Sequence, residues 1–250
     1  MPRSVSILVA ILIPLAGSAQ LVDDFNPPRS NCCLAGAAQT LANQLLDWNQ
    51  LGRYHADNEK LKSQSDPQRV VFMGDSITDG WKLADYFPNK PYVNRGISGQ
   101  TTPQMLVRMY EDVINLKPAA MIVLAGTNDI ARNTGPETIE MLEENLMAMT
   151  ELAHGHGIKV ILCSVTPVSD YAPRKMTDGR PPSDILKLNT WMKDYAAKSH
   201  ETYADYFSAL VDAKGMLKED VSRDGLHPNE KGYELMAPVA VAAIQSALSK

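Results

Sequence analysis

The sequence predicts an α/β fold with a central, mostly parallel sheet. From Arg69 onward, short apolar runs of the kind that form buried strands alternate with longer stretches of helical periodicity. Such alternation is typical of βαβ units, whose crossovers make neighbouring strands parallel. Several apolar runs also stop at glycine-containing turns, and in open α/β sheets ligands bind beyond the carboxyl ends of the strands.

The elements follow in order along the chain. The first strand is a run of apolar β-formers that stops at Gly74. Pro136 suits the first turn of a later helix, and Gly157 suits its end. The predicted strands are Val70–Met73, Tyr92–Asn94, Met121–Ala125, Val160–Val165 and Thr202–Ala204. The predicted helices are Pro103–Leu116, Pro136–His154, Asp184–Ser199 and Glu230–Leu248.

The first residues, 1–19, have the pattern of a secretory signal peptide. Arg3 supplies a positive charge, an apolar region follows, and Gly17 and Ala19 occupy the small-residue positions before a cut at Gln20. The apolar region is short for a membrane span, and Pro14 favours cleavage over the alternative, an N-terminal anchor. The sequence therefore predicts a secreted or periplasmic protein with no stable membrane insertion after cleavage.

Residues 20–68 are expected to form a helical extension of one or two helices that packs on the main domain, residues 69–250. Its apolar side chains share one side at helical spacing: Leu41, Leu45, Trp48 and Leu51. The extension lies outside the motifs described below and indicates little about chemistry.

Composition and cysteine count limit the class of protein. The 250 residues carry a net charge of −5, which argues against a nucleic-acid partner. Hydrophobic residues make up 44% and charged residues 21%, as in ordinary globular proteins. The three cysteines are no disulfide framework: Cys32 and Cys33 are adjacent, and Cys163 lies in an apolar run and reads as a buried residue. The fate of Cys32 and Cys33 and the oligomeric state stay open.

Four short stretches place chemistry-bearing residues at the predicted edge of the sheet. They read "GDS", "NRGISGQT", "AGTND" and "DGLHPN" and contain Ser76, Gly99, Asn128, and the pair Asp224 and His227. A serine nucleophile needs a base within hydrogen-bond reach and a carboxylate that orients the base. Asp224 and His227 lie three residues apart across a turn, which can direct both side chains to one spot.

Acyl transfer also needs fixed donors for the oxyanion. The backbone N–H of Gly99 has no side chain in its way, the Asn128 amide is a side-chain donor, and the Ser76 N–H lies at a strand-to-helix turn. We therefore expect Ser76, Asp224 and His227 to be catalytic, and Ser76, Gly99 and Asn128 to form an oxyanion hole.

These four stretches resemble the conserved blocks of the SGNH hydrolases, the GDSL esterase/lipase family, and occur in the family's order. The resemblance identifies "GDS" with the nucleophile block, Gly99 with the second, Asn128 with the third, and Asp224 and His227 with the last. It implies a flavodoxin-like three-layer α/β/α fold over residues 69–250 with a five-stranded sheet, hydrolysis of esters or thioesters, and no cofactor.

Neighbouring polar residues have other expected roles. Asp75, Thr78, Asp79 and Arg95 are interpreted as structural, and Asp129 as a cap of the segment that follows it. The histidines of "HGHG" at residue 154 fit a helix end better than a metal site, and no metal is expected. The proline-rich stretch Thr166–Asp184 is predicted to be a loop that shapes the substrate pocket, and whether it acts as a lid stays open.

The sequence thus predicts a serine esterase that hydrolyses short-chain acyl esters, O-acetyl groups on carbohydrates above all, through an acyl-enzyme. Its partner would be a small-molecule or glycan ester. The alternatives are a lysophospholipase, thioesterase or arylesterase of the same family, or a non-catalytic glycan-binding module.

Overall fold

The computed structural model describes residues 45–250. The predictions for the signal peptide, for Cys32 and Cys33, and for residues 20–44 of the extension lie outside the described residues.

The sheet has five parallel strands in the order β2-β1-β3-β4-β5, which confirms the predicted sheet. The bounds are β1 Val70–Gly74, β2 Tyr92–Gly96, β3 Ala120–Leu124, β4 Lys159–Cys163 and β5 Thr202–Ala204. Gly74, at the end of central β1, pairs with Gly96 on one side and Leu124 on the other. The carboxyl ends of these three strands therefore lie side by side.

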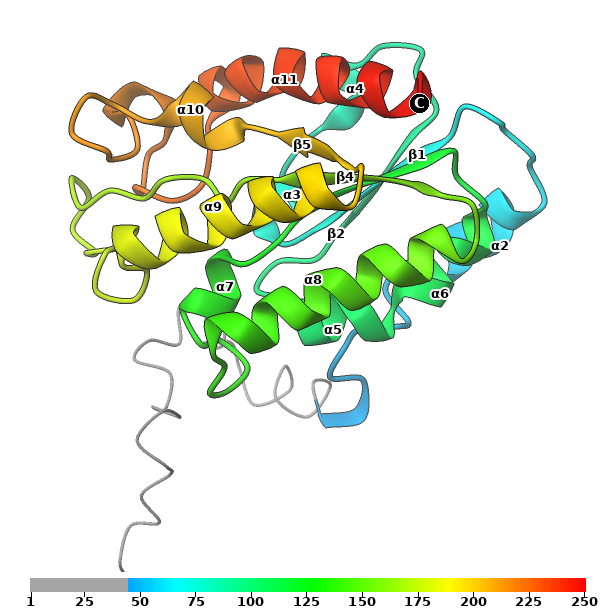
Figure 1. Cartoon of the computed structure of the whole chain (residues 1–250), viewed down its shortest axis with the longest axis horizontal. Helices are drawn as coiled ribbons and strands as arrows, with labels where there is room; N and C mark the ends of the chain where they lie inside the picture. The colour runs from blue at the N-terminus through cyan, green and yellow to red at the C-terminus, as the bar shows by residue number, and fades with distance from the viewer. Residues whose placement is uncertain (1–44) are drawn as a thin grey trace, which may run out of the picture.

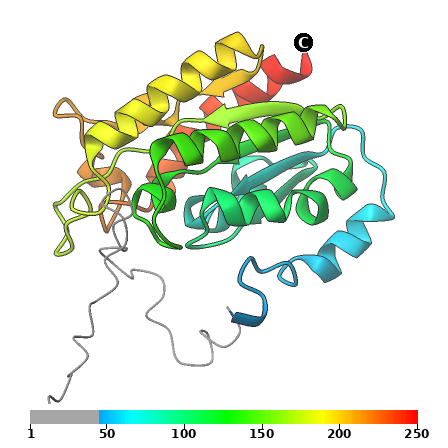
Figure 2. The same cartoon turned by 60° about the horizontal axis from the view of Figure 1, so that its bottom comes forward.

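Helices cover both faces of the sheet and make three layers (Figures 1 and 2). The helices are α2 His55–Lys62, α3 Ser76–Asp79, α4 Leu83–Tyr86, α5 Thr102–Val107, α6 Met109–Asp112, η1 Ile114–Leu116, α7 Thr127–Ile130, α8 Ile139–His154, α9 Pro182–Lys198, α10 Tyr206–Leu210, η2 Glu219–Val221 and α11 Glu230–Leu248. This arrangement is the predicted α/β/α fold.

Alternate residues of each strand enter different cores, as the period of a β-strand requires. Val71 and Met73 of β1 pack with side chains of α5, α8 and α9, whereas Val70 and Phe72 pack with those of α4, α10 and α11. Because β1 is buried on both faces, its sequence is a continuous apolar run rather than an alternating one. Cys163, at the end of β4, is fully buried as predicted, and burial raises the pKa of its thiol.

The predicted single helix Pro103–Leu116 is wrong: this stretch forms α5, α6 and η1. A capping box of Thr101 and Gln104 starts α5, which ends at Arg108, where the backbone turns to φ −92° and ψ 7°. The Arg108 guanidinium is fully buried and donates to Gly74 O over 3.1 Å. The chain leaves the helical path here, and this arginine reaches the end of β1.

The described part of the extension exposes the apolar side chains that the sequence places on one side. Within the described residues its helix is α2, and the side chains of Leu45, Trp48 and Leu51 are 85%, 49% and 40% exposed. Leu61 of α2 packs against the core of the main domain, and polar side chains make further contacts that are described below. Among residues 45–250, none of the helices combines the length and apolar composition that crossing a membrane requires.

Candidate active site

Ser76 begins α3 directly beyond the end of β1. Asp75 caps this helix, because its Oδ1 accepts a hydrogen bond of 2.9 Å from the Ile77 N–H. The helix packs tightly on β2: a Cβ on Gly96 would lie 2.1 Å from the Asp79 nitrogen, so only glycine fits there. Ser76 is thereby held at the carboxyl edge of the sheet, half-buried.

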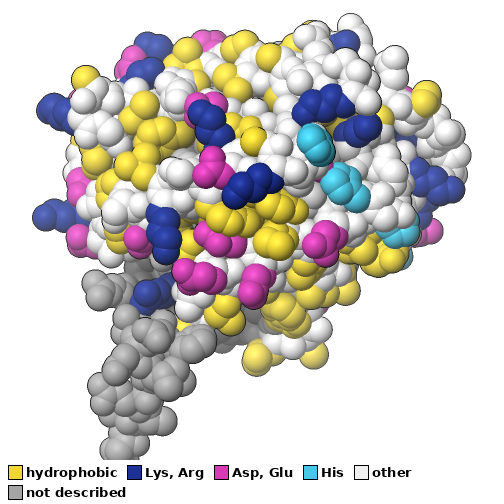
Figure 3. Space-filling view, in the orientation of Figure 1, with side chains coloured by type: hydrophobic (Ala, Val, Ile, Leu, Met, Phe, Trp, Pro, Cys, Tyr) yellow, Lys and Arg dark blue, Asp and Glu magenta, His cyan; other side chains and the backbone are white. Residues whose placement is uncertain are grey.

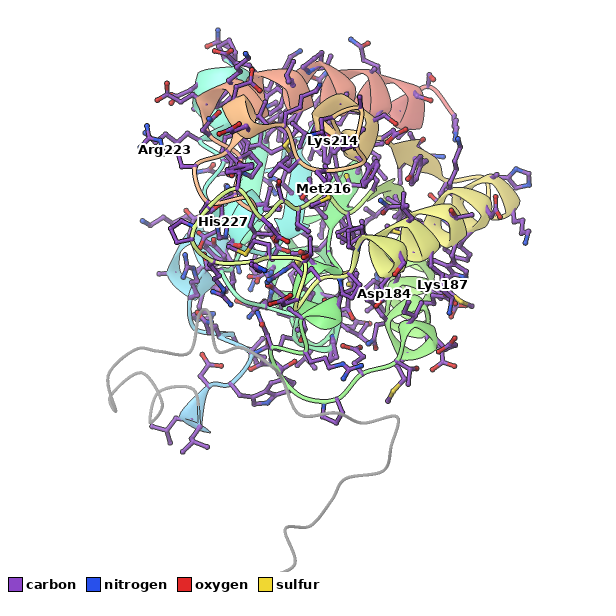
Figure 4. The ribbon with its side chains drawn as sticks, turned by 90° about the vertical axis from the view of Figure 1, so that its left-hand side faces the viewer. Asp184, Lys187, Lys214, Met216, Arg223 and His227 are labelled. Carbon is purple, nitrogen blue, oxygen red and sulfur yellow. The ribbon has the colours of Figure 1, made fainter. Side chains whose placement is uncertain are left out.

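Asp224 and His227 share one turn between η2 and α11. Asp224 Oδ1 accepts hydrogen bonds from the backbone N–H groups of Leu226, at 3.0 Å, and His227, at 2.8 Å. Gly225 supplies the left-handed backbone of the turn, with φ +81°. The turn leaves Asp224 Oδ2 only 2.6 Å from His227 Nδ1. Figure 4, which looks at the molecule from the left-hand side of Figure 1, labels His227 at the left of the view.

The structure brings the three residues together across 151 positions of sequence. His227 Nε2 lies 2.9 Å from Ser76 Oγ, while its Nδ1 faces Asp224. When Nδ1 donates its proton to the carboxylate, Nε2 is left as the acceptor for the serine hydroxyl. The geometry therefore couples a hydroxyl, an imidazole and a carboxylate in series.

The electrostatics keep Asp224 ionised. Partial burial by itself would raise the pKa of Asp224, but the hydrogen bonds from the His227 ring and from the His227 and Leu226 N–H groups outweigh burial. Together they lower the pKa to about 2. A carboxylate with so low a pKa stays charged beside the imidazole at any ordinary pH.

Gly99 and Asn128 lie on two neighbouring loops. Gly99 follows β2 with φ +83°, and Asn128 lies in α7, which follows β3. The Asn128 Nδ2 donates to Gln100 O over 3.0 Å, so the Asn128 amide is directly tied to the residue after Gly99. An amide nitrogen carries two protons, and this bond uses one of them.

Two residues that the sequence analysis missed orient the Asn128 amide. Asn133 Nδ2 donates to Asn128 Oδ1 over 2.9 Å, and Arg180 Nη2 donates to the same oxygen over 3.3 Å. Arg180 is 1% exposed and comes from the long proline-rich loop before α9. With Oδ1 engaged by two donors, the nitrogen end of the amide has a defined direction. A charged residue in a polar loop carries no local signal of this role.

The expected role of Asp129 is wrong. Its Oδ1 accepts from the Thr102 N–H at 2.7 Å and from the Thr102 hydroxyl at 2.6 Å, so it serves the start of α5 rather than the segment after it. Burial raises the pKa of Asp129, and burial together with the nearby Asp129 charge raises the pKa of Glu137 to about 8.

One further cluster has the residue types of a metal site. One ring nitrogen of His55 and one carboxylate oxygen each of Glu59 and Glu111 lie within 4.8 Å of one another at the α2 surface. Lys62 Nζ donates to Glu59 over 2.7 Å and to Glu111 over 3.2 Å, so the lysine already pairs with both carboxylates of the cluster.

A hydroxyl, imidazole and carboxylate in series, at the carboxyl edge of a parallel sheet, is the arrangement that serine hydrolases use. Within that class, residues 72–235 match the model of the GDSL-like Lipase/Acylhydrolase family. The match spans well over half of the chain, and the chain belongs to this family. The expected resemblance is therefore confirmed.

Several known proteins resemble this chain. A candidate acylhydrolase of Bacteroides fragilis has a solved structure that is 39% identical, covers 81% of this chain and 99% of its own, and superposes with a TM-score of 0.75. Esterase TesA of Pseudomonas aeruginosa is 26% identical over 67% of this chain and 83% of its own length. An acetylxylan esterase of Xylanibacter ruminicola is 26% identical over 73% of this chain, which spans 44% of that protein.

Family membership and these esterase relatives identify the chain as a carboxylic ester hydrolase.

Proposed function

We propose that this protein is a serine esterase that works through an acyl-enzyme, with Ser76, His227 and Asp224 as its catalytic residues. The observation that carries the proposal is the series of short contacts from Ser76 Oγ to His227 Nε2, at 2.9 Å, and from His227 Nδ1 to Asp224, at 2.6 Å. Residues 69–250 then form the hydrolase domain.

In the first half of the reaction, Ser76 Oγ attacks the ester carbonyl while His227 Nε2 takes the hydroxyl proton. Asp224 holds the imidazole in the required tautomer and stabilises its positive charge. His227 then gives the proton to the leaving alcohol. In the second half, His227 activates a water molecule that attacks the acyl-enzyme, and the acid leaves.

The negative charge on the carbonyl oxygen needs donors that are in place before the reaction. We assign this role to the N–H groups of Ser76 and Gly99 and to the second amide proton of Asn128. Removal of one such donor typically costs about 3–4 kcal/mol of transition-state stabilisation. The bonds from Asn133 and Arg180 to Asn128 Oδ1 support this assignment, because they fix the orientation of the Asn128 amide.

The substrate that we propose is a short acyl ester, in particular an O-acetyl group on a carbohydrate. The acetylxylan esterase relative supports this choice. Export by the predicted signal peptide of residues 1–19 would bring the enzyme to polysaccharides outside the cytoplasm.

The test is a series of initial hydrolysis rates on p-nitrophenyl esters from acetyl to palmitoyl, followed by acetylated xylo-oligosaccharides. We expect the rate to peak at acetyl and Ser76→Ala to lower kcat roughly 10⁴- to 10⁶-fold. Asp224→Asn should lower kcat by about 10⁴-fold through the wrong imidazole tautomer. Ser249→Ala, which removes a hydroxyl at the end of α11, is the matched control and should be neutral.

A rate that peaks at long acyl chains would replace the carbohydrate substrate with a lipid or thioester. Activity that survives in Ser76→Ala would contradict the serine mechanism. Glycan binding without turnover, unchanged in Ser76→Ala, would instead indicate a binding module.

A further inference from the structure

The loop that carries Gly99 is held by contacts from the extension as well as by Asn128 and Arg108 of the main domain. This Gly99 loop, residues 97–101, joins β2 to α5 at the candidate oxyanion site. Residues 49–58, which we call the clamp segment, run along the outer side of α5 and α6, with α2 beside α6 (Figures 1 and 2). Their polar side chains and backbone contact the Gly99 loop and its flanks.

Three positions around Gly99 receive these contacts. Before the loop, the Tyr54 hydroxyl donates to Gly96 O. After Gly99, the Gln100 side-chain Nε2 donates to Asn49 O over 2.8 Å. Gln100 is 1% exposed, so this bond lies within the packed structure. Gly96, three residues before Gly99, and Gln100, directly after it, are therefore bonded directly to the clamp segment.

The third contact passes through Asp79. Arg53 Nη2 donates to Asp79 Oδ1 over 2.8 Å. Asp79 Oδ2 accepts from the Ser98 N–H at 3.1 Å and from the Ser98 hydroxyl at 2.6 Å. Since Asp79 is the last residue of α3, the helix that begins at Ser76, this carboxylate joins the nucleophile helix to the residue before Gly99.

Arg95 of β2 in turn holds the clamp segment in place. The Arg95 guanidinium is 4.6 Å from the centre of the Tyr54 ring and donates to Asp57 over 2.7 Å and Asn58 over 2.9 Å. Asn58 is fully buried and donates to Asp112 over 2.7 Å. The clamp groups that hold the loop therefore belong to an ordered structure.

We propose that the clamp segment takes part in catalysis by positioning, with Arg53 and Tyr54 as positioning residues for the Gly99 N–H. The proposal rests on the oxyanion role of Gly99 and Ser76 stated above. It extends that role, because it assigns a catalytic contribution to an extension that carries none of the family motifs.

Position matters at this point for a physical reason. An oxyanion donor stabilises the transition state only when it already points at the place where the charge develops. A glycine at φ +83° has no side chain to lock it, so its neighbours must hold it. Displacement of such a group by about 1 Å can lower the rate roughly 100-fold.

The experiment compares Arg53→Ala, Tyr54→Phe and the conservative Arg53→Lys in the full chain. Lys62→Ala is the matched control, because Lys62 follows in α2 and pairs with Glu59 and Glu111 rather than with the loop. For each variant we would measure kcat and KM on p-nitrophenyl acetate, the midpoint of thermal unfolding, and inhibition by a small boronic acid. A boronic acid forms a tetrahedral adduct on a serine and thus reports on the oxyanion site.

We expect Arg53→Ala and Tyr54→Phe to lower kcat roughly 10- to 100-fold with KM within about twofold, and Arg53→Lys to restore part of the loss. Boronic acid affinity should fall in step with kcat/KM, whereas Lys62→Ala should leave both unchanged. Wild-type kcat and boronic acid affinity in Arg53→Ala and Tyr54→Phe, even with lowered thermal midpoints, would overturn the proposal.

Two further variants separate this failure from failure of the proposed function. If Ser76→Ala loses activity and Asn128→Ala is slow while both clamp variants are normal, the clamp alone is wrong. If Ser76→Ala keeps full activity, the serine mechanism is wrong, and the positioning role falls with it.

Discussion

Asp75 stands beside the nucleophile in a position that penalises its charge. Its side chain is 1% exposed, and burial raises its pKa to about 6 although the Ile77 N–H bond opposes the shift. An aspartate in the unfolded chain has a pKa near 4. Between about pH 4 and pH 6 the folded protein therefore holds a proton that the unfolded chain has lost, so stability falls as pH rises through this window.

We predict that Asp75→Asn raises the free energy of unfolding at pH 7 by about 1–3 kcal/mol, because Asn keeps an oxygen for the Ile77 N–H and carries no charge. It should also flatten the fall in stability between pH 4 and pH 6. Urea unfolding at pH 4, 5, 6 and 7.5 measures both effects. An Asn variant with the same pH profile as the wild type would contradict the assignment of this titration to Asp75.

At the scale of elements, the turn that carries His227 depends on the long loop between β4 and α9. Ser169 of that loop donates its N–H to Gly225 O over 2.9 Å. A Cβ on Gly225 would lie 2.2 Å from Ser169 O, and the residue has φ +81°. The long loop thus contacts the active site twice, through Ser169 at the His227 turn and through Arg180 at Asn128.

We predict that Gly225→Ala lowers kcat roughly 10- to 100-fold, because the turn must shift and moves His227 away from Ser76. Gly215→Ala is a matched control: Gly215 has the same φ of +81°, but a Cβ there meets nothing within 4 Å. It should cost about 1–2 kcal/mol of stability from backbone strain alone and leave kcat unchanged. Equal kcat values for the two variants would show that the contact with Ser169 does not position His227.

At the scale of the whole molecule, buried Arg108 connects parts that are distant in sequence. It donates to Gly74 O at the end of β1, to Gln100 Oε1 over 2.7 Å and to Asp112 Oδ2 over 2.8 Å. Burial by itself lowers the pKa of Arg108, and the Asp112 carboxylate opposes that shift. Because Asp112 also accepts from Asn58, this pair links the sheet, the Gly99 loop and the clamp segment.

We predict that Arg108→Ala lowers the free energy of unfolding by about 3–5 kcal/mol, since Asp112 is then buried without its charge partner. Lys62→Ala, which breaks surface ion pairs, should cost less than about 1 kcal/mol. Chemical denaturation of both variants tests the contrast. A loss of similar size in the two would mean that the buried pair adds little to stability.

On the face in Figure 3, acidic and basic side chains are interspersed and no large patch of one sign is visible. The prediction of no nucleic-acid partner therefore still rests on the net charge of −5.

The sequence by itself determined the strands, their alternation with helices, and the turns at Ser76, Asn128 and His227. Strand period, buried apolar runs and turn residues are local properties, so a short stretch of chain expresses them completely. Asp224 and His227 belong to one turn, which is why their pairing was visible without coordinates.

Only the tertiary structure decided what supports the site. Three of these supports join residues about 27 to 52 positions apart: the bond from Arg180 to Asn128, the bonds from Thr102 to Asp129, and the bond between Gln100 and the clamp segment. The fourth is the break of the predicted helix at Arg108, where a buried side chain accompanies a turn of the backbone. The sequence around a polar residue is the same whether its side chain faces water or bonds to a buried carbonyl. Burial chooses between the two, and burial exists only once the chain has folded.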